Sequence, residues 1–173
     1  MRLQEGFSLA EFLVVVAIMG IVATFTVPSI ADLRDRNAIR GAADAIRSDL
    51  QLAQFEAIKR NAVVRFTVDT AAGCWGIETG SSCGCSVSVG GPTNVCNIKR
   101  SASGEVVGAT ITGARFGSAT WTAFDPVRGT VAAGSVELTS RLGRRVEIHI
   151  NPIGLTKVCT PDGAAATSPL RSC

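Results

Sequence analysis

The sequence predicts an α+β protein in which one long N-terminal helix precedes a small domain of antiparallel strands. Three observations lead to this fold class. Residues 7–27 form an apolar run with a single charge, residues 31–61 repeat apolar side chains at helical spacing, and the apolar period changes to two from Val64 onward. A chain of 173 residues is expected to hold one domain plus an anchor.

The apolar run over residues 7–27 is long enough to cross a bilayer as a helix, since about 18 apolar residues suffice. Its one charge is Glu11, near the start. A carboxylate costs about 2.5 to 3.5 kcal/mol at the centre of such a helix, so we expect a partner that neutralises it. A cut between Gly6 and Phe7 would place the new α-amine of Phe7 about one helical turn from Glu11, in the same or a neighbouring subunit.

A short motif in this region resembles the processing site of type IV pilins and type II secretion pseudopilins; it consists of Gly6, Phe7, Ser8, Leu9 and Glu11. The resemblance implies that residues 1–6 are a leader removed by a prepilin peptidase and that Phe7 is then N-methylated. It also implies that Glu11 docks subunits into a filament. The alternatives are a plain membrane anchor and an ordinary signal peptide, whose apolar run has only about 7–15 residues.

The second part of the predicted helix is amphipathic. Its apolar residues recur at three- and four-residue steps and form one stripe: Ile39, Ala42, Ile46, Leu50, Ala53 and Ala57. We therefore expect one helix from Phe7 to about Asn61, with a transmembrane or filament-core half over residues 7–30 and an amphipathic half over residues 31–61. Pro28 resembles the proline that kinks this helix in many pilins, and it can bend a helix without ending it.

Residues 62–173 are predicted to form a β-rich globular domain. Val64, Phe66 and Val68 alternate with polar residues, as in a half-buried strand. Further strands are expected at residues 74–78, 106–111, 119–124, 136–138, 146–150 and 155–158, with a turn at residues 151–154.

This layout resembles one branch of the pilin family, the GspH/FimT group of minor pilins and pseudopilins. The matching segments are residues 53–61, at the predicted helix end, and residues 124–129, before the late strands. The resemblance implies a pilin-like fold in which the long helix packs against a small antiparallel sheet domain.

Six cysteines all follow the apolar helix: Cys74, Cys83, Cys85, Cys96, Cys159 and Cys173. An even number on one side of a membrane segment suggests disulfides in an oxidising compartment, which is the periplasm in a Gram-negative host. The preferred pairing joins Cys159 to Cys173 and leaves two bridges among the other four. Zinc is the alternative, but the spacing of Cys83 and Cys85 does not fit the usual knuckle.

Little in the sequence supports catalysis. The single histidine, His149, stands between Ile148 and Ile150, and no Ser–His–Asp or Cys–His arrangement can be built around it. We therefore expect no enzymatic activity, no catalytic residue, no metal and no cofactor.

Five basic residues suggest an alternative function, DNA binding during DNA uptake; they are Arg128, Arg141, Arg144, Arg145 and Lys157. A solvated hairpin end is the simpler interpretation, and a patch that binds DNA through its phosphates is the other. Some FimT-type minor pilins take part in DNA uptake with a Gly-Arg-x-Arg motif. Residues 154–157, Gly-Leu-Thr-Lys, match its position but lack the first arginine and have lysine in place of the second.

Together these features predict a minor pilin or pseudopilin that joins or primes a type IV pilus or a type II secretion pseudopilus. Its expected partners are other pilin or pseudopilin subunits, the prepilin peptidase and inner-membrane lipid. We expect a single-pass inner-membrane protein with a periplasmic C-terminal domain. Arginines just after the span, including Arg34 and Arg36, would favour the opposite orientation. The cysteines and the leader outweigh them, and the sequence does not separate the two machines.

Overall fold

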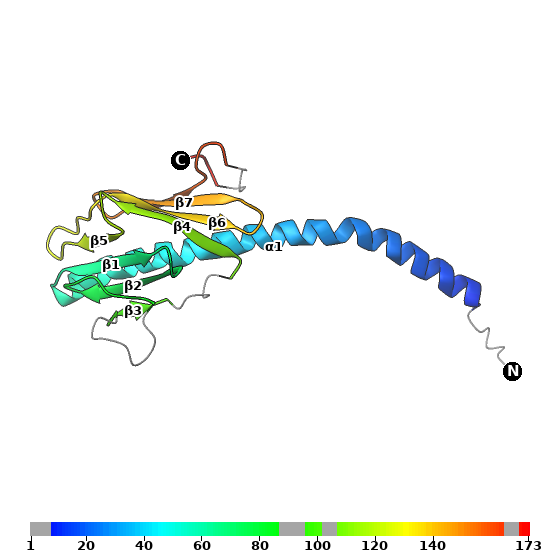
Figure 1. Cartoon of the computed structure of the whole chain (residues 1–173), viewed down its shortest axis with the longest axis horizontal. Coiled ribbons are helices and arrows are strands. Elements are labelled where there is room, and N and C mark those ends of the chain that lie inside the picture. Colours follow the sequence, from blue (N-terminus) through cyan, green and yellow to red (C-terminus); the bar gives the residue numbers. More distant parts are fainter. Residues whose placement is uncertain (1–7, 87–95, 102–106, 165–169) are drawn as a thin grey trace. The chain divides into compact units, whose positions relative to one another are not determined.

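The computed structural model describes residues 8–86, 96–101, 107–164 and 170–173, without the side chains of residues 24–29. The chain divides into two compact units, Met1–Arg34 and Asp35–Cys173. Figure 1 shows the elements of both. Gly6 and Phe7, the predicted cleavage and methylation site, lie outside the described residues, as does the side chain of Pro28.

One long helix, α1, runs from Leu9 to Arg60, as the sequence predicted. It ends where Asn61 takes a left-handed conformation with φ of 47°, which asparagine tolerates better than most residues. The amide of the next residue, Ala62, donates to the carbonyl of Ala57 at 3.2 Å and satisfies one of the last free carbonyls.

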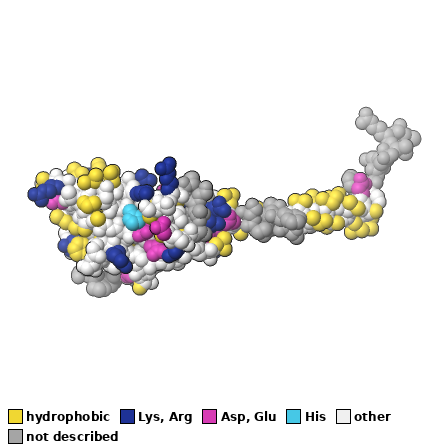
Figure 2. All heavy atoms as spheres, turned by 90° about the horizontal axis from the view of Figure 1, so that it is seen from above, with side chains coloured by type: hydrophobic (Ala, Val, Ile, Leu, Met, Phe, Trp, Pro, Cys, Tyr) yellow, Lys and Arg dark blue, Asp and Glu magenta, His cyan; other side chains and the backbone are white. Residues whose placement is uncertain are grey.

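In the first unit, the described part of α1 exposes apolar side chains all around the helix. Twelve large ones are at least 40% exposed: Leu9, Phe12, Leu13, Val14, Val15, Val16, Ile18, Met19, Ile21, Val22, Ile30 and Leu33. Figure 2 shows hydrophobic side chains covering this helix. A search of the described residues finds no helix that combines the length and the apolar character needed to cross a membrane.

In the second unit, the strands form two antiparallel four-stranded sheets, a division that the sequence had not indicated. The first sheet has the order β3-β2-β1-β5, with β1 at Val64–Asp69, β2 at Cys74–Thr79, β3 at Lys99–Arg100 and β5 at Trp121–Phe124. The second has the order β4-β6-β7-β8, with β4 at Ala109–Phe116, β6 at Gly134–Ser140, β7 at Arg145–Ile150 and β8 at Thr156–Cys159.

A single core joins the second part of α1 to both sheets (Figure 1). The six residues of the predicted apolar stripe are all at most 5% exposed, which confirms that this face packs inward. The alternating residues of β1 and β7 meet it from the two sheets, because side chains in a strand point to opposite faces in turn.

Several strands differ from the prediction: β6 spans Gly134–Ser140 rather than residues 136–138, and β5 begins at Trp121 rather than residue 119. The fourth strand begins at Ala109 rather than residue 106 and extends to Phe116. Its register shifts between Ile111 and Gly113, and this bulge interrupts the two-residue period that would have revealed its length. The strand β3 has only two residues and pairs through Lys99 and Arg100, too short for any periodicity to show.

Two aspartates of α1 tie the helix to the two sheets. Asp49 is 2% exposed and accepts hydrogen bonds from Trp75 Nε1 and Lys99 Nζ, both at 2.7 Å, on the first sheet. Asp35 accepts from the hydroxyl of Ser140 at 2.6 Å, at the end of β6 in the second sheet. Each buried carboxylate therefore has donors that offset its loss of hydration.

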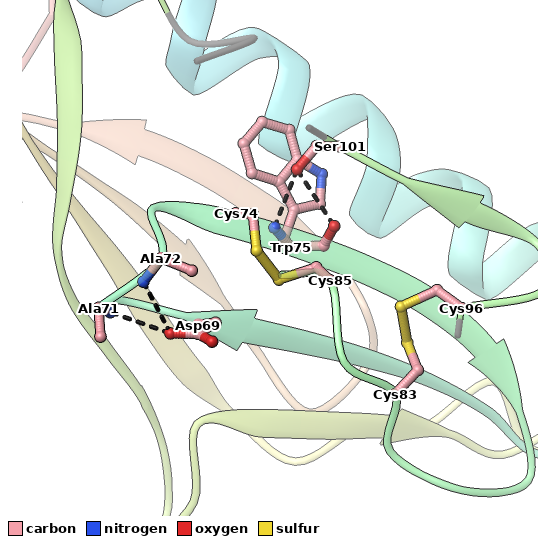
Figure 3. Close-up of a disulfide and its surroundings, with 9 residues drawn as sticks. All are labelled: Asp69, Ala71, Ala72, Cys74, Trp75, Cys83, Cys85, Cys96 and Ser101. Carbon is pink, nitrogen blue, oxygen red and sulfur yellow. Dashed lines mark hydrogen bonds between the residues drawn. A yellow bond between two sulfur atoms is a disulfide. The ribbon is translucent and has the colours of Figure 1, made fainter. Parts of the chain in front are cut away.

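Three disulfides use all six cysteines: Cys74–Cys85, Cys83–Cys96 and Cys159–Cys173. The last is the preferred sequence pairing, and the other two lie within the expected group of four. Figure 3 shows the first two bridges beside β2 and Trp75. A Cβ on Gly76 would lie 2.0 Å from Cys96 Sγ, so the Cys83–Cys96 bridge covers this part of β2 directly.

Candidate functional site

Glu11 lies in the first turn of α1, the region that the sequence singled out. Its amide donates to the carbonyl of Ser8 at 3.0 Å, and its side chain is exposed. Leu9 and Phe12 beside it are 79% and 62% exposed. The first turn of a helix favours negative charge because its free N–H groups point outward. The site therefore presents one carboxylate at the start of an apolar helix.

Two of the five predicted DNA-contact residues face carboxylates of the same chain. Arg144 Nε lies 3.7 Å from Asp35 Oδ2, and the arginine side chain is only 14% exposed. Arg145 Nη1 lies 3.6 Å from Glu137 Oε1 on the neighbouring strand β6. These contacts reduce the positive charge that the hairpin end offers to a phosphate.

Arg128 does not join the arginines of the β6–β7 turn. It is exposed in the connection after β5, where Asp125 Oδ1 accepts from the amides of Arg128 and Val127, both at 2.8 Å. These backbone hydrogen bonds, that from Arg128 first, lower the pKa of Asp125 below its usual 3.8. The next residue, Gly129, accepts from Gln54 Nε2, whereas Arg144 faces Asp35. Asp35 and Gln54 are separated by about 28 Å of helix.

Lys157 lies on another surface again. It is exposed on β8 and lines a groove of about 440 Å³ that also includes Arg40 and Arg47 of α1. Asp44 stands in the same groove and offsets part of the charge. Arg141 is exposed in the turn between β6 and β7. The structure therefore distributes the five basic residues rather than gathering them into one patch.

Two groups of candidate metal ligands occur among the described residues, and each contains a disulfide. His149 lies within 4.8 Å of the sulfurs of Cys159 and Cys173, which are bonded to each other. A carboxylate oxygen of Asp69 lies within 4.8 Å of both sulfurs of the Cys74–Cys85 bridge. A sulfur in a disulfide cannot act as a thiolate ligand, so neither group offers a metal site in this oxidised form.

Sequence reasoning missed the anchoring roles of Asp35 and Asp49. The signal was present, because each is an acid beside the apolar stripe of α1, where a buried charge requires a partner. It also missed the apolar residues Ile153 and Leu155, which are 64% and 65% exposed in the turn before β8.

Comparison with known families gives two matches. Residues 42–154 match the model of the family described as type II transport protein GspH. Residues 1–27 match the model described as the prokaryotic N-terminal methylation motif. Searches of curated proteins and of solved structures found no match.

Proposed function

The chain belongs to the GspH family of type II transport proteins, and from this premise we propose that it is cut after Gly6, methylated at Phe7 and assembled into a filament through its N-terminal helix. The two family matches support the general role of a minor pilin or pseudopilin, a structural subunit. The maturation steps and the assembly are the proposal. It includes an inner-membrane precursor with its C-terminal unit in the periplasm.

The observation that carries the proposal is the exposed apolar surface of residues 9–23 and 30–33, the part of this segment whose side chains the structure describes. Twelve large apolar side chains in this segment are at least 40% exposed. Burial of one such side chain contributes about 1.5 to 3 kcal/mol, so the segment strongly favours an apolar covering. Lipid supplies it for the precursor, and the corresponding helices of neighbouring subunits supply it after assembly.

Glu11 determines how these helices fit together. Within an apolar bundle its carboxylate needs a cation, and the amine of a mature Phe7 in a neighbouring subunit is the proposed one. A hydrogen bond to a charged group contributes about 1.5 to 3 kcal/mol, which corresponds to roughly tenfold or more in affinity. The pair therefore selects the axial position at which one helix packs against the next.

Maturation is tested first by intact-mass and N-terminal peptide analysis of the protein from its native membrane. We expect a chain that begins at N-methylated Phe7. The Gly6→Ala variant should accumulate as the longer precursor. A wild-type chain that keeps residues 1–6, or normal maturation of Gly6→Ala, would refute the proposed processing site.

The role of Glu11 is tested with Glu11→Ala in the full-length chain. We expect normal cleavage after Gly6 but at least a tenfold smaller share of the protein in the sheared filament fraction. Asp44→Ala is the matched control, since it removes an exposed acid from the same helix. Equal incorporation of the two variants would contradict the pairing of Glu11 with Phe7.

We also propose that the machine is a secretion pseudopilus rather than a type IV pilus, and the family description, which names type II transport, supports this choice. Deletion of the gene should then block release of secreted enzymes and leave surface pili intact. Loss of pili with normal secretion would assign the subunit to a pilus instead.

DNA binding is the second candidate function, and the groove between α1 and β8 is the observation that favours it. Arg40, Arg47 and Lys157 line this groove, and basic side chains in a row suit a phosphate backbone. Exchanging all three for glutamine should abolish salt-dependent binding of duplex DNA to the full-length protein. In the matched control variant, Arg141 and Arg145 are replaced by glutamine. An equal loss of DNA binding in both variants would show that the contact does not lie in this groove. Absence of DNA binding by the wild type would refute the hypothesis.

A further inference from the structure

One end of the second unit carries an unusual share of its exposed apolar surface. Among the described residues of 35–173, eight large hydrophobic side chains are exposed, and six of them occur at this end. We call these six the end patch: Phe55, Ile58, Val63, Val127, Ile153 and Leu155. The other two, Val107 and Leu142, lie elsewhere in the unit. Figure 2 shows hydrophobic side chains gathered at the left end of the globular unit.

Contacts around Gln54 bring the segments of the end patch together. Gln54 Nε2 donates to the carbonyl of Gly129, in the connection between β5 and β6, at 3.4 Å. Gly154, in the turn between β7 and β8, lies so close to the same side chain that a Cβ there would be 2.4 Å from its nitrogen. The two connections also touch directly, because the amide of Val131 donates to the carbonyl of Pro152 at 3.0 Å.

The patch residues flank these contacts. Phe55 and Ile58 follow Gln54 on the helix by one and four residues, and Val127 is two residues before Gly129. Ile153 and Leu155 lie on either side of Gly154. With Val63, the six patch residues are between 42% and 84% exposed, although these backbone contacts hold the segments in place. An ordered, exposed apolar cluster of this kind is typical of a protein interaction site.

The charges beside the patch are basic. Lys59 and Arg60 end the helix with side chains 61% and 45% exposed, and Arg128 is exposed next to Val127. Two nearby acids, Asp125 and Glu56, accept hydrogen bonds within the chain and offset part of this positive charge. The Glu56 side chain is 9% exposed, and its pKa is lowered by hydrogen bonds from Arg60 and Lys59. The end patch is therefore apolar with a positive rim.

We propose that the end patch docks another protein subunit whose contact surface is apolar at its centre and acidic at its edge. This rests on the proposed function, since it supplies a second contact for the assembled subunit. A symmetric contact with a second copy would bring like charges together, which is unfavourable.

Photocrosslinking in intact host cells tests the proposal with the full-length chain. A photoreactive amino acid replaces Leu155 in one strain and Leu142 in the control strain; both positions are exposed, at 65% and 59%. We expect position 155, and not 142, to crosslink to a different pilin-like subunit. Mass spectrometry of the crosslinked peptide should place acidic residues beside the contact. Adding Arg128→Glu should lower the yield about tenfold.

Three outcomes would overturn the proposal: equal crosslinking from positions 155 and 142, a crosslink to a second copy of the chain, or a crosslink to lipid. A complementary pair of variants measures the effect on assembly. Ile153→Ser with Leu155→Ser should lower the filament share at least fivefold, whereas Val107→Ser with Leu142→Ser should not change it. Both pairs should mature normally at Phe7, so a failure of processing refutes the proposed function and not the docking surface.

Discussion

The ion pair between Asp49 of α1 and Lys99 of the first sheet predicts that the two residues contribute unequally to stability when each is replaced. Asp49→Ala leaves the buried indole N–H of Trp75 without an acceptor, which costs about 1 to 3 kcal/mol. Lys99, 40% exposed, can turn to water in that variant. Lys99→Met instead leaves a carboxylate that is only 3% exposed with no cation, which costs about 3 to 5 kcal/mol. Replacing Lys99, the more exposed residue of the pair, is therefore expected to lower the free energy of unfolding more than replacing Asp49.

The assay is thermal unfolding of the full-length chain in detergent with its disulfides oxidised, followed by near-ultraviolet circular dichroism of the tryptophans. At roughly 3 °C per kcal/mol for a unit of this size, we expect Tm to fall by about 6 °C for Asp49→Ala and by about 9 to 15 °C for Lys99→Met. Asp44→Ala is the control, and its effect should stay within about 0.5 kcal/mol because this acid is exposed.

The double variant decides whether the charge pair is the cause. Once Asp49 is alanine, Lys99→Met no longer strands a carboxylate, so the double variant should resemble Asp49→Ala alone. Additive effects of the two substitutions, or a larger loss from Asp49→Ala than from Lys99→Met, would refute the reasoning.

Three further predictions concern stability of the second unit. Gly154→Ala should cost about 2 kcal/mol in thermal unfolding, since φ is +82° and the new Cβ would clash; Gly143→Ala, with φ +76° and open space, should cost only about 1 kcal/mol. The folded-state pKa of Asp125 is lowered, so its stabilisation is present above its usual 3.8 and is lost as pH falls through the lowered value; Asp125→Asn should flatten this acid dependence of Tm. Replacing Cys159 and Cys173 by serine should cost about 3 kcal/mol in denaturant unfolding, and an unchanged midpoint would show that the bridge adds nothing.

Local periodicity made much of the fold predictable. The stripe from Ile39 to Ala57 repeats at helical spacing, and the alternation in β1 and β7 spans whole strands. Where the period was short or broken, prediction failed. The two residues of β3 carry no pattern, and the bulge at Gly113 hides the true extent of β4.

The candidate sites divide in a similar way. Gly6, Phe7 and Glu11 form a motif of consecutive or nearly consecutive residues, so the sequence alone identified them, and their roles remain predictions. The basic residues could not be placed from the sequence. Gly129, next to Arg128, contacts Gln54, whereas Arg144 faces Asp35, about 28 Å away along α1, because strand β6 runs between the two connections that carry them.

The sequence by itself determined the elements whose cause is local: the apolar helix, its amphipathic continuation, most strands and the bridge between Cys159 and Cys173. Only the tertiary structure decided which distant residues meet. It divided the strands into two sheets, paired Asp49 with Trp75 and Lys99, and gathered Phe55, Val127 and Leu155 at one end. The physical reason is that these contacts join residues far apart in the sequence. A local pattern of apolar and polar residues predicts a helix or a strand, but it does not predict which segments pack together in the common core.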